Sequence, residues 1–114
     1  PTLPAPEARA RKLLPDVSLQ ELLLSMADVL RRADMFESHQ VTREQLSTRE
    51  RMSDVLERLK GGAFVPFVQL FRAEEGRLGV VVTFMAVLEL IKEQLVELVQ
   101  NEAFAAIHVR ARVE

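Results

Sequence analysis

Two stretches of the chain place apolar residues three or four positions apart, which is the spacing of one face of an α-helix. Each stretch begins with a serine that is followed three residues later by a glutamate: Ser18 and Glu21 in the first, Ser47 and Glu50 in the second. This pair is the capping box found at many helix N-termini. The pattern predicts one helix over about 18–35 and a second that stops at a Gly-Gly pair. The apolar positions are Leu19, Leu22, Met26, Val29, Leu30 and Ala33 in the first helix and Met52, Val55, Leu56 and Leu59 in the second.

The stretch over 78–91 has helical length and carries one charge, Glu89. On a helical wheel its apolar residues fill two opposite arcs, whereas a helix on the surface of a small domain buries one. We expect the first arc to face the core and the second to be covered by another protein or another copy of the chain, unless the helix over 18–35 folds back over it. The core arc is Val80, Phe84, Val87, Leu88 and Ile91. The candidate interaction surface is Leu78, Val82, Met85 and Ala86.

The C-terminal part of the chain alternates between apolar and polar residues, as a strand with one buried face does. Together with 95–100, this alternation predicts a β-hairpin that turns near Asn101 and Glu102. Further upstream, 63–65 is a short β-prone piece, and 39–46 is a strand or merely extended. The alternating residues are Ile107, Val109 and Ala111 against His108, Arg110 and Arg112.

Pro66 is well placed at the first turn of a short helix before the long apolar one. The predicted order is therefore helix, short strand, short helix, long helix and hairpin, which is the order of a winged helix. The predicted fold class is mainly α with a small β-hairpin (α+β). We expect a poorly ordered Pro-rich linker over 1–17, a linker helix over 18–36 and the winged-helix domain over 37–114.

The length and composition fit one modest hydrophobic core, because 114 residues of which 48% are apolar make an ordinary globular domain. The net charge of −2 provides no field that would attract a polyanion such as DNA. The chain has no cysteine, and no apolar run long enough to span a membrane. It begins with Pro1 and shows no signal-peptide pattern, so we expect a piece of a longer protein.

The residues that carry chemistry in enzymes are sparse. His39 and His108 have no second ligand at metal-binding spacing, and two of the serines are better explained as helix caps. The Gly61-Gly62 pair lacks the residues of a phosphate-binding loop. We therefore predict no catalytic residues, metal, cofactor or small-molecule substrate, and a chain that is not an enzyme.

Winged helices commonly bind DNA through the third helix, but this one offers aliphatic side chains where base readout needs hydrogen-bonding groups. Arg77 and Lys92 are offset there by Glu89 and Glu93. The basic stripe of the hairpin, His108 with Arg110 and Arg112, contacts phosphates or an acidic partner, or is polar simply because it faces water. We treat Arg110 and Arg112 as a candidate charged rim of the interaction surface.

The segments LSTRERMSDVLERL (46–59), FVPFVQLF (64–71) and GVVVTFMAVLELIKEQLVELVQNEAFAAIHV (79–109) closely resemble the C-terminal domain of segregation and condensation protein A, the bacterial kleisin. The upstream LPDVSLQELLLSMADVLRRA (14–33) resembles the end of that family's central region. One departure is the pair Gly76 and Gly79, which brings the first turn of the third helix into question.

The resemblance implies a non-catalytic subunit fragment whose winged helix docks on the ATPase head of an SMC protein in chromosome condensation and segregation. It also implies that the upstream region binds a dimer of segregation and condensation protein B, that DNA is reached only through the complex, and that the protein is cytoplasmic and nucleoid-associated. The alternative is a winged-helix DNA-binding regulator that dimerises through the helix over 18–35.

Overall fold

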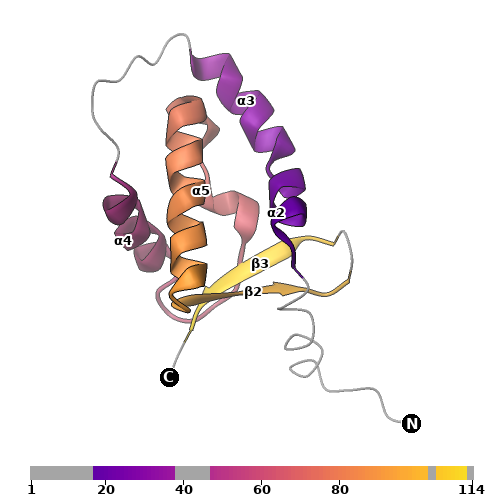
Figure 1. The fold of residues 1–114 in the computed structure, drawn as a ribbon, viewed down its shortest axis with the longest axis vertical. Helices are drawn as coiled ribbons and strands as arrows, with labels where there is room; N and C mark the ends of the chain where they lie inside the picture. The colour runs from indigo at the N-terminus through magenta and orange to yellow at the C-terminus, as the bar shows by residue number, and fades with distance from the viewer. Residues whose placement is uncertain (1–16, 38–46, 103–104, 113–114) are drawn as a thin grey trace.

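The computed structural model describes residues 17–37, 47–102 and 105–112. Within them the chain is mainly helical with a small antiparallel sheet, as the sequence predicts (Figure 1). The helices are α2 (Leu19–Ser25), α3 (Ala27–Glu37), α4 (Thr48–Arg58) and α5 (Gly76–Lys92), with short 3-10 helices η2 (Phe67–Leu70) and η3 (Ala73–Glu75). The strands are β1 (Val65–Pro66), β2 (Val96–Gln100) and β3 (Ile107–Ala111), in the order β1-β3-β2. The predictions for 1–16 and 39–46, His39 included, lie outside the described residues.

The predicted hairpin is confirmed. Strands β2 and β3 pair in an antiparallel register that sets Leu98 opposite Val109, and Val65 of β1 pairs with Val109 from the other side. The predicted alternation is also present, because Ile107 and Val109 are buried while His108 and Arg110 are half-exposed. The sheet therefore closes one end of the helical core through a single apolar face.

The helix predicted over 18–35 forms as two segments that meet at Met26. Its start is as expected: the Ser18 hydroxyl accepts a hydrogen bond from the Glu21 backbone N–H at 3.1 Å. At Met26 the backbone N–H donates to the carbonyl of Leu23 at 3.0 Å, three residues back, which tightens the turn between α2 and α3. The axis therefore changes at Met26, whose own side chain is 1% exposed.

Both glycines at the start of α5 have a structural role. Gly76 has a φ of +81°, a conformation that favours glycine. A Cβ on Gly79 would lie 2.5 Å from the Cβ of Glu75, so a larger residue would push η3 away from the helix. The first turn that the sequence brought into question is formed.

The C-terminal end of α5 is a Schellman motif with Gln94, at a φ of +62°, in the position that glycine usually holds. The backbone N–H of Gln94 donates to Ile91 and that of Leu95 donates to Leu90, each at 2.9 Å. This turn directs the chain from the helix into β2.

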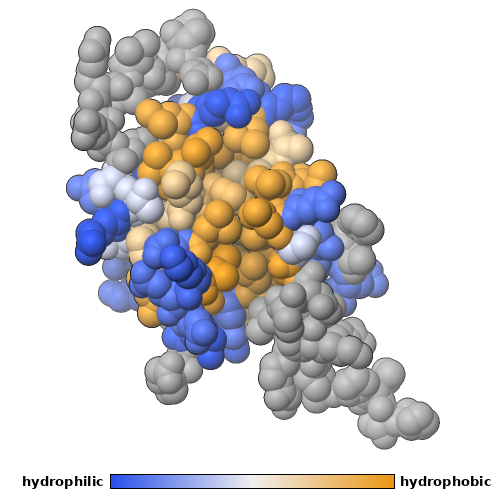
Figure 2. Space-filling model, viewed as in Figure 1, coloured by the Kyte–Doolittle hydropathy of each residue, from blue (hydrophilic) through white to orange (hydrophobic). Residues whose placement is uncertain are grey.

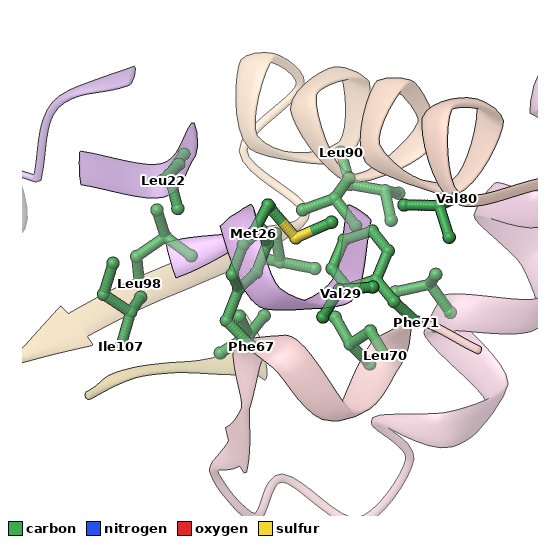
Figure 3. Packing of buried hydrophobic residues seen from close by; sticks show 14 of the residues in the cluster. Leu22, Met26, Val29, Phe67, Leu70, Phe71, Val80, Leu90, Leu98 and Ile107 are labelled. Carbon is green, nitrogen blue, oxygen red and sulfur yellow. The ribbon is translucent and has the colours of Figure 1, made fainter. Parts of the chain in front are cut away.

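One hydrophobic core joins all of these elements, and the helices upstream of α4 belong to it (Figure 3). Met26 and Val29 lie next to Phe67 from η2, whose ring meets that of Phe71 edge to face at 5.1 Å. Leu90 of α5 is fully buried against this group. The segments that we expected as a linker helix and a separate domain thus share one core.

Candidate docking surface

One side of α5 points outward and is apolar. Leu78 is 55% exposed and Met85 is 53% exposed, and Val81 lies between them on the same stripe. Leu88 continues the stripe one turn further and is half-buried. The space-filling view shows hydrophobic side chains gathered over α5 and toward α2, with hydrophilic groups around them (Figure 2). An exposed apolar area of this kind on a small domain indicates an interaction surface.

The stripe ends in a hollow between α2, α5 and the hairpin, with a volume of about 340 Å³. Leu88 belongs to both the stripe and the hollow, and Leu19 of α2 also lines the hollow. We call Leu19, Leu78, Val81, Met85 and Leu88 the docking face. The hollow is lined by Val17, Leu19, Leu22, Leu88, Ile91, Gln94, Val96, Glu97, Leu98 and Arg112.

The entry of the chain into α2 explains why the α2 side of the hollow is apolar. Val17, just before the Ser18 cap, and Leu22, in the first turn and a half, both line the hollow. Their positions are those of the hydrophobic staple, in which the residue before the cap packs on the fourth helical residue. The local signal that starts the helix therefore also builds part of the hollow.

The four α5 residues predicted for the interaction surface have different positions. Leu78 and Met85 are exposed and Val82 is half-buried, whereas the assignment of Ala86 is wrong because its side chain is 0% exposed. The physical reason is that α3 packs on one side of α5 and α4 on the other, so more than one arc of the helix is covered (Figure 1). The two-arc pattern found the exposed side but misplaced its edge.

The alternative that the 18–35 helix folds back on the long helix is also partly realised. Asp34 of α3 accepts two hydrogen bonds from the Arg77 guanidinium of α5, both at 2.9 Å. These hydrogen bonds lower the pKa of the Asp34 carboxyl from its ordinary value of 3.8. Because Leu78 and Met85 nevertheless stay exposed, the contact covers only part of the second arc.

Val81 and Leu19 were not predicted for the interaction surface, and Leu88 was predicted for the core arc but is half-buried and lines the hollow. Val81 follows Leu78 by three residues and precedes Met85 by four, which is the helical spacing that defines a stripe. That spacing was available in the sequence, but Val81 had not been placed on either arc. Leu19 could not have been found in the same way, because only the fold brings α2 to the same hollow as α5 and β2.

The two predicted rim arginines also differ. Arg110 donates a hydrogen bond to the Glu97 carboxylate across the hairpin, and its guanidinium lies 4.6 Å from the centre of the Phe64 ring. It therefore links the hairpin to the segment before β1 and is committed within the fold. Arg112 is exposed, and its side chain lies at the hollow.

A second, more polar cleft of about 490 Å³ lies between α4 and η3. It contains the ion pair between Arg51 and Glu75, whose Nη1 and Oε2 atoms are 2.9 Å apart. In the described parts of the chain, no three acidic or imidazole side chains come together as a metal site would require. None of the helices in those parts combines the length and the apolarity that a membrane span needs.

The chain has close relatives among segregation and condensation proteins. The family profile described as "Segregation and condensation protein ScpA" matches residues 10–112. Proteins called segregation and condensation protein A from Xylella fastidiosa (strain Temecula1) and Coxiella burnetii are each 49% identical to it, over 93% and 94% of the chain. The corresponding protein of Myxococcus xanthus is 36% identical over 92% of the chain.

The aligned part makes up 35%, 40% and 36% of those three relatives, so the chain spans well under half of their length. Within that part the match is nearly continuous, since it covers both the helices upstream of α4 and the C-terminal hairpin. The chain belongs to the segregation and condensation protein ScpA family.

Proposed function

We propose that this chain is the part of a kleisin subunit that docks, as a winged helix, on the ATPase head of an SMC protein in chromosome condensation and segregation. Family membership supports the setting, and the element order from α4 to β3 supports the winged helix. In this proposal the upstream region contributes to binding a dimer of segregation and condensation protein B. The protein acts without catalysis in the cytoplasm, at the nucleoid, and reaches DNA through the complex.

The exposed apolar side of α5 is the observation that carries the proposal. A winged helix that reads DNA presents donors and acceptors from this helix to the base edges of the major groove. Here the outward side chains are Leu78, Val81 and Met85, which offer neither. They suit a partner that excludes water, and a protein surface does so.

The test is binding of this chain to a cognate SMC ATPase head, measured by co-purification and calorimetry, with one variant on the docking face and one matched control. Met85→Glu places a charge at the centre of the face and is expected to abolish binding. Met35→Glu makes the same chemical change at the end of α3, where the side chain is 69% exposed and lies off the docking face. The control is expected to bind like the wild type.

Both methionines are more than half exposed, so both variants should keep the helix content and melting temperature of the wild type. The proposal fails if the wild type does not bind the head. It also fails at this surface if folded Met85→Glu binds as well as Met35→Glu.

The second candidate function, a DNA-binding regulator that dimerises through the 18–35 helix, is less well supported. Leu22, Met26 and Val29 of that helix are each at most 3% exposed in the chain's own core and are not free for a dimer contact, although Leu23 and Leu24 stay exposed. Binding to random duplex DNA at two salt concentrations separates the candidates. Phosphate binding weakens steeply with salt, so strong low-salt binding that disappears at high salt would favour the regulator.

A further inference from the structure

The two ends of the docking face differ in charge. At the N-terminal end of α5 the exposed cation is Arg77, and its charge is compensated by the bidentate pair with Asp34. At the other end the exposed cations are Lys92, in the last turn of α5, and Arg112, beside the hollow. Within the described residues neither of these two side chains pairs with a carboxylate.

Three acidic groups lie near the same end, and each is placed differently. The Glu97 carboxylate lines the hollow but accepts a hydrogen bond from Arg110. Glu89 is half-buried at the edge of the stripe. Glu93 follows Lys92 and is therefore turned about 100° away from it around the helix axis. Arg112, in the lining of the hollow, and Lys92, which directly follows Ile91 of that lining, are thus the exposed cations at this end.

Arg112 is held in place by the backbone around it. The backbone N–H of Arg112 donates a hydrogen bond to the Leu95 carbonyl at 3.0 Å, which extends the pairing of β2 and β3 by one residue toward the end of α5. Leu95 belongs to the Schellman turn that also fixes the last residues of α5, where Lys92 lies. One turn of the backbone therefore presents both cations at the same end of the docking face.

We infer that the partner surface is apolar along α5 and carries carboxylates at the hollow end, where they meet Lys92 and Arg112. This inference rests on the proposed function and deepens it, because it states the chemistry and the direction of the docking. Unpaired cations at the rim of an apolar contact act mainly on the rate of association and on the choice of partner. The neutral Arg77–Asp34 end provides no such attraction.

The experiment uses two double variants that change the net charge equally. The test variant combines Lys92→Glu and Arg112→Glu. The control variant combines Arg49→Glu, on α4, and Lys60→Glu, just after it. Arg49 and Lys60 are exposed and belong to the segment on the other side of α5 from α2. Binding of the SMC ATPase head is measured by surface plasmon resonance at low and high salt, after each variant has been shown to melt like the wild type.

The inference predicts that the Lys92–Arg112 variant binds the head about tenfold more weakly at low salt, through slower association, and that the gap narrows at high salt. The control variant should bind like the wild type. Unchanged or tighter binding by the Lys92–Arg112 variant would overturn the inference while leaving the proposed function intact. An equal loss of binding in both variants would also overturn the inference, because the loss would then depend only on the net charge of the chain. Absence of wild-type binding overturns both.

Discussion

Helices α2–α3 and α4 begin with the same local signal and end up with different shares of the core. Ser18 and Ser47 each accept a hydrogen bond from the backbone N–H three residues on, at 3.1 and 3.3 Å. The first pair of helices then buries an apolar residue on almost every turn, while α4 buries Val55 within the helix and Leu59 at its end. The fully buried residues of α2–α3 and the Met26 junction are Leu22, Met26, Val29 and Ala33.

The difference shows that local sequence determines where a helix begins, whereas the elements packed around a helix determine how many of its residues are buried in the core. Helix α3 packs on both α5 and η3, and α4 packs mainly on α5. The helices upstream of α4 therefore stabilise the fold to which the docking face belongs, and are more than a connection leading to it.

Removing residues 1–37 is expected to abolish cooperative folding. Without α2–α3, the apolar sides of α5, η2 and the sheet that contact Met26 and Val29 would face water, which a domain of this size cannot sustain. Thermal unfolding followed by circular dichroism would show no sharp transition. The control is a chain that begins at Val17, which retains every described residue of the core. A sharp transition in the shorter chain would mean that the part from α4 to β3 folds alone.

A matched pair of methionine substitutions measures the same difference within the intact chain. Met26→Ala removes a side chain that is 1% exposed and should cost about 2–5 kcal/mol of unfolding free energy. Met52→Ala on α4 removes a half-buried side chain and should cost clearly less, about 1 kcal/mol. Urea unfolding of both variants gives the two values. Equal losses would contradict the assignment of the main core to the upstream helices.

The two capping serines should behave alike despite this difference in burial. Ser18→Ala and Ser47→Ala each remove one side-chain hydrogen bond to a backbone N–H, and each should cost about 1 kcal/mol. Because the effect is local, the two values should agree within a few tenths of a kcal/mol. A much larger loss at Ser18, measured in the same urea experiment, would show that the cap also fixes the Val17–Leu22 wall of the hollow.

Prediction from sequence succeeds here wherever the pattern is local. The two serine caps, the hairpin and the long helix follow from spacing along the chain, and the structure has all of them. The errors concern what covers each side of α5. Ala86 was assigned to the surface because a helical wheel contains no information about α4 and α3, which pack on two sides of α5. Leu19 belongs to the docking face only because the fold brings distant segments to one hollow.

The smallest effect is expected for the ion pair that ties α3 to α5. Hydrogen bonds from Arg77 lower the pKa of Asp34 below its ordinary value of 3.8, so the folded state favours the carboxylate. A lowered carboxyl pKa adds stability that is complete above the unfolded value and is lost as the pH falls through the folded value. The pair is exposed, so this loss should be a small fall in melting temperature below about pH 4.

Asp34→Asn should remove the contribution of this pair at neutral pH and flatten the melting temperature between about pH 5 and pH 2 relative to the wild type. Asp28 provides the matched control, because its pKa is also lowered, first by Arg32 and also by Arg31, but both arginines belong to α3 itself. Asp28→Asn should therefore change the melting temperature less than Asp34→Asn does, since only the Asp34 pair joins two helices. If the two variants shift it equally, the Arg77–Asp34 contact does not help to hold the upstream helices on α5, and their attachment depends on the buried side chains alone.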